Sequence, residues 1–379
     1  MNINNLKVTT EDWPPKVHEN ADTALVVNDG VEEQPKVNPY ITNFFKKKPK
    51  LLTVDEYMDG IIAGNRTILS QAITLVESYL PAHRAIAQQI IARCQEYSVK
   101  HVRSKRIGIT GVPGAGKSTF IEAFGSFITS QGHKLAVLAI DPSSEKSKGS
   151  ILGDKTRMET LCNDPNAFIR PSPSAGSLGG VARKTRETVL LCEAAGYDVI
   201  FIETVGVGQS ETAVHSMSDF FLLLMLSGAG DDLQGIKRGI MEMSDLIAIT
   251  KADGTNVEKA NLAKALYANA LHLFPPTEST WVPTAVTSSA VTKEGLPEIL
   301  RIIEEYFKLV EGNGYYERKR REQARYWMYE SINETLRNNF YEDSLIESKL
   351  KDYEEAVLEG KMDSFMAAAE LMGIYKERR

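Results

Sequence analysis

The stretch that decides the fold class reads Gly111-Val112-Pro113-Gly114-Ala115-Gly116-Lys117-Ser118-Thr119. Gly111 precedes Gly116-Lys117-Ser118 by the four-residue interval of a phosphate-binding loop. The motif has this meaning only when a buried strand comes before it and a helix comes after it. Residues 106–110 are short and apolar, as in a buried parallel strand, and residues 118–130 place apolar side chains at helical spacing. We therefore predict a nucleoside triphosphate site.

Each residue type in this loop has a chemical reason. Glycines let successive backbone N–H groups turn toward phosphate oxygens, and the helix N-terminus adds partial positive charge. Lys117 offers a point charge to the β- and γ-phosphates, and the Ser118 hydroxyl offers an oxygen ligand to Mg²⁺. We therefore assign residues 111–119 to nucleotide binding, Lys117 also to catalysis and Ser118 also to the metal.

The rest of the central region alternates short apolar runs with helical segments. This pattern predicts an α/β fold with a mainly parallel central sheet and helices on both faces. Ligands of such sheets bind at the carboxyl ends of the strands, where Asp141, Glu203, Ser227 and Lys251 fall. The six predicted strands are 107–110, 135–140, 199–202, 220–226, 246–250 and 281–286.

The sequence Thr250-Lys251-Ala252-Asp253 follows a buried strand and predicts the base. The Asp253 carboxylate can accept from both N1–H and the 2-amino group of guanine, whereas adenine offers an acceptor at the corresponding position. The Lys251 stem can lie along the face of the base. A lone Lys-x-Asp is common by chance, but its place after a phosphate loop favours guanine. Backbone N–H groups of Ser289, Ala290 and Val291, after the last strand, are expected to close over the base.

Carboxylates near the phosphate loop predict a Mg²⁺ site, because hard oxygen ligands suit this ion. Glu203 is expected to act on Mg²⁺ through its water shell, and we assign it to both catalysis and the metal. Asp141 and Asp154 are further candidates, and the sequence leaves open which of them is a direct ligand. Gly206 follows Glu203 by three residues, and its backbone N–H is expected to contact the γ-phosphate and so to respond to its presence.

Two further loops carry candidates for hydrolysis. Gln209 could orient the attacking water, with contact to a partner protein as the alternative. Lys237 lies in the loop 227–239, whose small and charged residues after an apolar strand indicate a mobile functional segment, and we assign it to catalysis. His215 could serve as a base, but packing of this side chain is the favoured interpretation.

Segments on both sides of the central domain predict helical additions. Residues 1–50 contain several prolines and no sustained periodicity, which indicates a flexible tail. Residues 51–103 predict two helices separated at Pro81, residues 104–310 the phosphate-loop domain, and residues 311–379 a helical arm that we expect to mediate dimerisation. The cationic run Arg318–Arg321 is interpreted as a solvated helix face.

The composition excludes several classes of protein. The chain has 379 residues, 42% of them hydrophobic and 25% charged, and a formal charge of −6, which argues against a nucleic-acid binder. No apolar run approaches the ~20 residues of a membrane span, and the N-terminus is unlike a secretory signal. Three scattered cysteines suit a reducing compartment, so a cytoplasmic protein that interacts with neither membranes nor nucleic acid is expected.

Five motifs together resemble the methylmalonyl-CoA mutase-associated GTPases of the MeaB type. They are the phosphate loop, Asp141-Pro-Ser-Ser, Gly149-Ser-Ile-Leu-Gly-Asp-Lys-Thr-Arg-Met, Glu203-Thr-Val-Gly-Val-Gly-Gln-Ser-Glu and Gly228-Ala-Gly-Asp-Asp-Leu-Gln-Gly-Ile-Lys. The resemblance implies a GTPase that binds GTP, GDP and Mg²⁺ and chaperones an adenosylcobalamin-dependent acyl-CoA mutase. It further implies gating of cofactor loading, protection of the mutase, and a homodimer formed through C-terminal helices. Residues 231–237 match the third switch loop of the family.

The chain departs from the family pattern in three places, and two other functions are alternatives. Thr250 stands where guanine motifs commonly have Asn, residues 145–148 are more charged than in the family, and residues 1–50 match no family segment. An ATPase of basic amino-acid transport shares sequence features, but Asp253 favours guanine. A nickel-insertion GTPase shares the fold, yet such proteins usually carry His- or Cys-rich tracts, and here six histidines and three cysteines are scattered.

Overall fold

The computed structural model describes residues 51–78, 80–140, 158–171, 178–204, 210–227 and 238–377. The predicted tail, residues 1–50, lies outside these ranges. Residues Leu52–Arg379 form one compact unit. The predicted boundaries at 103/104 and 310/311 within this unit stay predictions.

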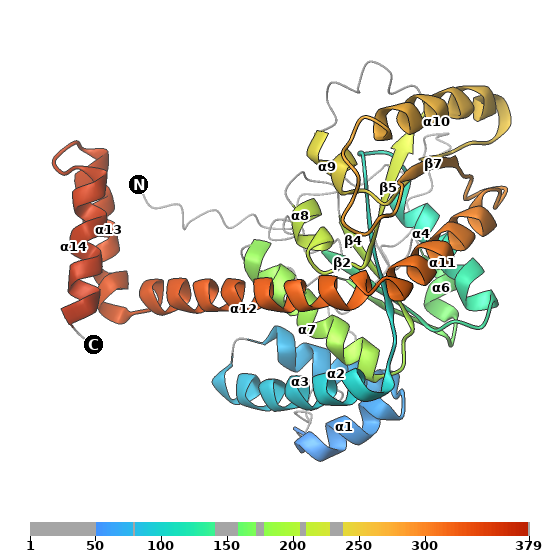
Figure 1. Cartoon of the computed structure of the whole chain (residues 1–379). Coiled ribbons are helices and arrows are strands. Elements are labelled where there is room, and N and C mark those ends of the chain that lie inside the picture. The colour runs from blue at the N-terminus through green and yellow to red at the C-terminus, as the bar shows by residue number, and fades with distance from the viewer. Residues whose placement is uncertain are drawn as a thin grey trace, which may run out of the picture. The chain divides into compact units, whose positions relative to one another are not determined.

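A seven-stranded sheet forms the centre of the unit, with the strand order β3-β2-β4-β1-β5-β6-β7 (Figure 1). Every pairing between the described strands is parallel, which confirms the predicted α/β fold. The strands are β1 (Lys105–Gly111), β2 (Leu135–Ile140), β3 (Ala167–Arg170), β4 (Val199–Thr204), β5 (Phe220–Leu226), β6 (Leu246–Thr250) and β7 (Thr284–Thr287).

Alternating side chains of each strand bury against helices on opposite faces of the sheet. In β4, Val199 and Phe201 join the core under α4 (Lys117–Ser130), whereas Ile200 and Ile202 join the core under α7 (Leu178–Ala194). Because both faces are covered, all six residues of β4 are buried, as is typical of parallel sheets. Burial of each large apolar side chain contributes about 1.5–3 kcal/mol, so the sheet is a rigid support for the loops at its edge.

Helices cover both faces of the sheet. One face carries α4, α6 (Glu159–Asn163) and α11 (Leu296–Gly312). The other face carries α7, α8 (Ser210–His215), α9 (Arg238–Met243) and α10 (Val257–Leu271). The helices that precede β1 pack in the same core as α7. Helices on both faces were predicted and are confirmed.

The N-terminal extension has three helices where the sequence predicted two. They are α1 (Val54–Ile62), α2 (Arg66–Glu77) and α3 (Pro81–His101). Thr53 and Glu56 form a capping box at the start of α1. The missed break falls between α1 and α2, where Gly64 has a φ of 71° and the Asn65 side chain accepts from the N–H groups of Thr67 and Ile68. The break at Pro81 was predicted correctly.

The strand predictions were wrong in two places. Strand β3 was missed because it has only four residues, two of which are half-buried at the edge of the sheet. Strand β7 begins at Thr284 rather than Trp281, since Pro283 cannot donate a ladder hydrogen bond.

Helices complete the C-terminal part of the chain (Figure 1). They are α12 (Tyr315–Tyr341), α13 (Ser344–Leu358) and α14 (Ser364–Glu377). One face of α13 packs inward, because Ile346 is buried and Leu350, Tyr353 and Val357 are half-buried. Among the residues that the structure describes, no helix combines the length and apolar composition needed to cross a membrane.

Candidate functional site

The phosphate loop lies between β1 and α4, where the motif predicted it. Gly116 has a φ of 77° immediately before the first helical residue, a conformation that glycine adopts without strain. Gly111 is required for another reason, since a Cβ here would stand 2.4 Å from the Leu224 carbonyl oxygen. The loop closes with a hydrogen bond from the Ala115 N–H to the Val112 carbonyl (3.1 Å). Pro113, Gly114 and Thr119 are exposed, which leaves the outer side of the loop accessible.

Lys117 is the first residue of α4 and turns back over the loop. Its Nζ donates to the Gly111 carbonyl oxygen at 2.9 Å, so the ammonium lies where the loop closes. Burial lowers the pKa of Lys117 below its usual range, and the carboxylates of Glu203 and Glu211 counteract this shift. The ammonium group therefore lies in the field of two carboxylates.

Glu203 is held at the end of β4, next to the loop. It pairs in the sheet with Ile109, two residues before Gly111, and only 6% of its surface is exposed. Behind it, the Thr204 and Thr110 hydroxyls share a hydrogen bond of 2.9 Å that joins β4 to β1. Ser118 lies half-buried in the first turn of α4. The predicted hydroxyl and carboxylate oxygens thus belong to elements that end at the same edge of the sheet.

Glu211 is a further candidate that was not predicted from the sequence. It lies in the first turn of α8, is 7% exposed, and contributes to the charge around Lys117. It is the last residue of the quoted motif Glu203-Thr-Val-Gly-Val-Gly-Gln-Ser-Glu, and its burial could not be read from that motif.

The predicted base-recognition residues follow β6. The Thr250 hydroxyl donates to the Ala115 carbonyl oxygen at 2.8 Å and so ties the end of β6 to the phosphate loop. This hydroxyl explains why Thr can stand where guanine motifs commonly have Asn, because a polar side chain here joins the two parts of the site. Lys251 has a φ of 56°, and its Cε lies 3.8 Å from the place of a Cβ on Gly116. Its stem therefore lies beside the loop.

Asn256 holds this segment and was not predicted from the sequence. Its side-chain amide donates to the Lys251 carbonyl oxygen at 2.7 Å and accepts from the Ser227 hydroxyl at 2.6 Å. These bonds stabilise the left-handed backbone of Lys251, which costs free energy in a residue with a Cβ. Asn at a short distance after a turn is a local signal for such backbone contacts, but the sequence does not show which carbonyl it meets.

The loop after β7 contacts Asp253 directly. The Ser289 hydroxyl donates to Asp253 Oδ2 at 2.5 Å and accepts from the Val291 N–H at 3.1 Å. The Ser289 N–H donates to the Glu294 carbonyl at 3.0 Å. Two of the three predicted backbone donors are thus used within the loop, which narrows the expected contact with a base to the Ala290 N–H.

Five predicted site residues lie outside the described residues. They are Asp141, Asp154, Gly206, Gln209 and Lys237. Their assignments stay predictions.

Two other sequence interpretations concern residues near this site. His215 packs edge-on against Phe221, with ring centroids 5.4 Å apart, and burial followed by the charge of Lys319 lowers its pKa to about 4. The geometry supports the packing interpretation of this side chain. The interpretation of Arg318–Arg321 as a solvated face is wrong for its central residues, because Arg320 forms ion pairs with Asp219 and Glu193 and Lys319 donates to the Asp219 carbonyl.

A parallel sheet with a phosphate loop between β1 and α4, and with Asp253 at the end of β6, defines the class of P-loop nucleotide-binding proteins. Comparison with known proteins identifies the family within this class. The family model described as "Methylmalonyl Co-A mutase-associated GTPase MeaB" matches residues 69–344. The chain belongs to this family of GTPases, which hydrolyse GTP to GDP and phosphate, and the predicted resemblance is confirmed.

Two sequence relatives and one solved structure illustrate the similarity. The mouse "Methylmalonic aciduria type A homolog, mitochondrial" is 45% identical over 332 residues, covering 86% of this chain and 80% of the mouse protein. The "GTPase ArgK" of Escherichia coli is 46% identical over 289 residues, covering 76% and 86%. A crystal structure titled "LAO/AO transport system kinase" is 35% identical, with a TM-score of 0.67, and the match covers 86% of this chain and 100% of that one.

Proposed function

We propose that this GTPase chaperones an adenosylcobalamin-dependent acyl-CoA mutase of the methylmalonyl-CoA mutase class, gating cofactor loading and protecting the mutase from inactivation. The observation that carries the proposal is the family match over residues 69–344, which includes the nucleotide site and all of α12. The family is described as associated with methylmalonyl-CoA mutase, and the mouse relative is named for methylmalonic aciduria. The family description thus connects a GTPase to this mutase.

The arrangement of residues supports guanine nucleotides as the ligand. The loop presents backbone N–H groups and the Lys117 ammonium to phosphates, and Asp253, oriented by Ser289, offers carboxylate oxygens to a base. Lys117 and the loop can neutralise charge that develops on the transferred phosphate, which is the main contribution of a protein to phosphoryl transfer. Slow turnover that a partner accelerates is expected from a site of this kind.

The residues at the sheet edge also fit Mg²⁺. The Ser118 hydroxyl and the buried Glu203 carboxylate are hard oxygen donors beside the phosphate loop. We propose that these two residues hold the ion, Glu203 through its water shell, and that one of Asp141 and Asp154 is a further direct ligand. A bound Mg²⁺ would supply charge neutralisation at the phosphates.

Mixing the chain with an adenosylcobalamin-dependent methylmalonyl-CoA mutase is expected to give a complex and to raise the GTP hydrolysis rate at least about tenfold. Co-purification and phosphate release, measured with and without the mutase, check this result. A matched assay with an unrelated cobalamin enzyme controls for effects of the cofactor alone. Absence of both a complex and a rate change would contradict the chaperone proposal but not the GTPase activity.

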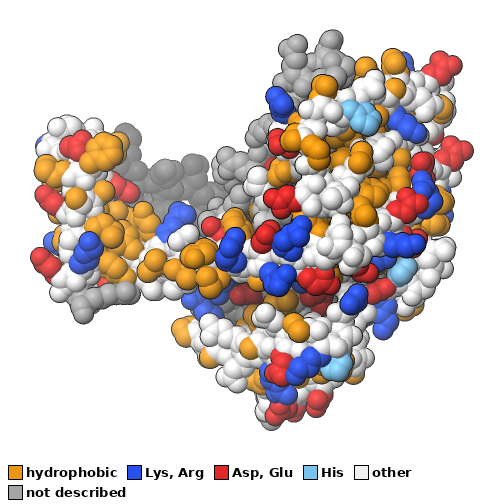
Figure 2. Space-filling model, viewed as in Figure 1, with side chains coloured by type: hydrophobic (Ala, Val, Ile, Leu, Met, Phe, Trp, Pro, Cys, Tyr) orange, Lys and Arg blue, Asp and Glu red, His pale blue; other side chains and the backbone are white. Residues whose placement is uncertain are grey.

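We further propose that the chain forms a homodimer through its C-terminal helices. One stripe of α12 exposes large apolar side chains, visible as orange surface in Figure 2, with Tyr329, Ile332 and Leu336 exposed by 57%, 47% and 55%. Beside this stripe, residues of α12, α13 and α14 line an apolar hollow of about 440 Å³. Contiguous exposed apolar surface of this kind favours a protein interface. A second copy of the chain is the occupant that the family resemblance implies.

Light scattering is expected to give twice the chain mass of 42.0 kDa for the wild type and the single mass for Ile332→Glu combined with Tyr329→Glu. A charge on each of two neighbouring apolar positions cannot be buried without a partner, so it opposes association. Leu262→Glu is the matched control, since Leu262 is an apolar residue of α10 that is 65% exposed. A monomeric wild type, or a dimer that survives both charges, would contradict the proposal.

A further inference from the structure

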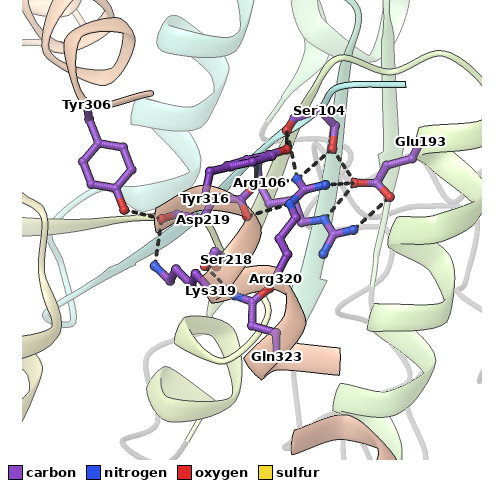
Figure 3. A network of polar contacts seen from close by, with 10 residues as sticks. All are labelled: Ser104, Arg106, Glu193, Ser218, Asp219, Tyr306, Tyr316, Lys319, Arg320 and Gln323. Carbon is purple, nitrogen blue, oxygen red and sulfur yellow. Dashed lines mark hydrogen bonds and ion pairs between the residues drawn. The ribbon is translucent and has the colours of Figure 1, made fainter. Parts of the chain in front are cut away.

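The first half of α12 contacts the nucleotide-binding domain through a row of side chains at helical spacing. Their polar groups bond to Ser104 before β1, to Glu193 of α7, and to the turn formed by residues 216–219 between α8 and β5. Figure 3 shows the contacts to Ser104, Glu193, Ser218 and Asp219. The row consists of Tyr316, Lys319, Arg320, Gln323 and Trp327. One helix therefore holds one turn through several independent bonds.

Asp219 is the centre of these contacts. Its carboxylate receives Arg320 in a two-pronged contact, with Nε to Oδ1 at 3.0 Å and Nη2 to Oδ2 at 2.6 Å. Its carbonyl oxygen accepts from the Lys319 ammonium and from the Tyr306 hydroxyl, both at 2.8 Å. Its backbone N–H donates to the Arg106 carbonyl at 2.8 Å. Asp219 is 2% exposed, so all these bonds are shielded from water.

The charges around Asp219 balance only when α12 is in place. Arg106 binds Glu193 of α7 through two hydrogen bonds of 2.8 and 2.9 Å, and Arg320 Nη1 lies 3.5 Å from the same carboxylate. Burial acts to raise the pKa of Glu193, but the two guanidinium groups and the Ser104 hydroxyl lower it to about 2. Glu193 thus contacts both guanidinium groups, whereas the Asp219 carboxylate pairs with that of Arg320, which belongs to α12, and accepts from the Arg106 backbone N–H at 3.0 Å.

A third arginine lies next to this network. The Arg186 guanidinium stands over the Trp327 ring at 5.9 Å, and among the described residues its buried Nη1 has no hydrogen-bond partner. Burial and the charge of Arg106 lower the pKa of Arg186 to about 10, whereas Glu193 and Asp219 act to raise it. A cation with a spare donor is therefore available to these carboxylates when Arg320 is displaced.

Short, rigid elements connect this turn to the nucleotide site. Strands β1 and β5 both begin at the network, since Arg106 is the second residue of β1 and Phe220 is the first residue of β5. They run side by side to the phosphate loop, where the Val112 N–H donates to the Leu224 carbonyl at 3.3 Å. On its other side the turn continues from α8, whose first turn carries Glu211 into the charge field of Lys117. A displacement of the turn of residues 216–219 would therefore move the backbone next to the phosphate loop and change the charges around Lys117.

We propose that α12 regulates GTP hydrolysis by holding the turn of residues 216–219 through the Arg320–Asp219 pair. A partner that binds the exposed face of α12 and shifts this helix changes the position of α8 and β5, and thereby the rate at the nucleotide site. Arg320 is a positioning residue in this arrangement, because it acts through Asp219 and touches no predicted nucleotide ligand. The proposal concerns GTP hydrolysis by this chain and does not require the mutase.

Arg320→Met is expected to lower kcat for GTP hydrolysis at least about fivefold, with KM for GTP within about twofold of wild type, because catalysis depends on positioning more steeply than binding does. Asp219→Asn is expected to lower kcat similarly. The double variant should be no slower than the slower single variant, since both changes remove one interaction. The assays use the full chain at a temperature where thermal melting shows every variant to be folded.

Glu334→Gln is the matched control. It removes the 3.5 Å ion pair of α12 with Arg183 of α7, which does not contact the turn, and should leave kcat within about twofold. If Arg320→Met does not fold, Lys319→Met is the alternative variant, because it removes another hydrogen bond between α12 and the turn, the one to the Asp219 carbonyl. If the variants lose thermal stability but keep the wild-type kcat, the network has only a structural role and the proposal is wrong. Additive losses of kcat in the double variant would also overturn the proposal.

Discussion

Replacing Lys117 with alanine is expected to weaken GTP binding at least about 100-fold and to abolish measurable hydrolysis, because charge-assisted hydrogen bonds to phosphate are lost. The ammonium group is held over the loop by the Gly111 carbonyl and lies near Glu203 and Glu211. Without it, these carboxylates would face the triphosphate with less compensating charge. Titration with a fluorescent GTP analogue in the presence of Mg²⁺ measures the loss.

Lys308→Ala provides the control for this experiment. Lys308 is an exposed residue of α11, so its removal changes the net charge equally without altering the loop. Thermal melting of both variants separates loss of binding from loss of fold. A dissociation constant within threefold of wild type for Lys117→Ala would contradict the assignment of the loop.

Asp253→Asn is expected to reduce GTP affinity by about 100-fold, since one of the two carboxylate acceptors is replaced by an amide donor that opposes a donor of the base. The Ser289 hydroxyl, which donates to Asp253 Oδ2, would keep the amide oxygen of the new side chain. The amide NH₂ would then face the 2-amino group of guanine. Xanthosine triphosphate carries a carbonyl oxygen at that position, so its affinity for the variant should rise.

Competition titrations with GTP, ATP and xanthosine triphosphate measure this change. Ser289→Ala is the companion variant, because it removes the hydroxyl that orients Asp253 and leaves the carboxylate itself in place. Its expected loss of GTP affinity is smaller, at most about tenfold. Equal competition by ATP and GTP in the wild type would show that the base assignment is wrong.

The sheet and the phosphate loop could be predicted because their signals are local. Strands such as β5 read as continuous apolar runs, and the glycines of residues 111–116 stand at fixed spacing before a helix. Strand β3 could not be predicted, since four residues at an edge carry little apolar signal. The break between α1 and α2 was missed because Gly64 and Asn65 interrupt a helical pattern that otherwise continues.

The parts of the site that were missed depend on contacts between distant segments. Arg320 and Asp219 are separated by 101 residues, so a short cationic run gave no sign that one of its members is paired in the interior. Asn256 and Glu211 have ordinary sequence surroundings, and only the folded chain brings them to Lys251 and Lys117. Local patterns predicted the loops, whereas the supports of these loops needed the tertiary structure.

The charge network at Asp219 also determines whether the C-terminal helices can be deleted from this protein or exchanged between members of its family. A fragment that ends before α12 would lose the ion pair between Arg320 and the buried Asp219 carboxylate, and it would leave the buried Glu193 with Arg106 but without Arg320. Breaking such a pair from one side is costly, of the order of 3–5 kcal/mol, which is a large fraction of the stability of a typical domain. The C-terminal helices are therefore not an independent unit that can be deleted or transferred to another protein. A substitution at position 320 also requires a compensating substitution at position 219.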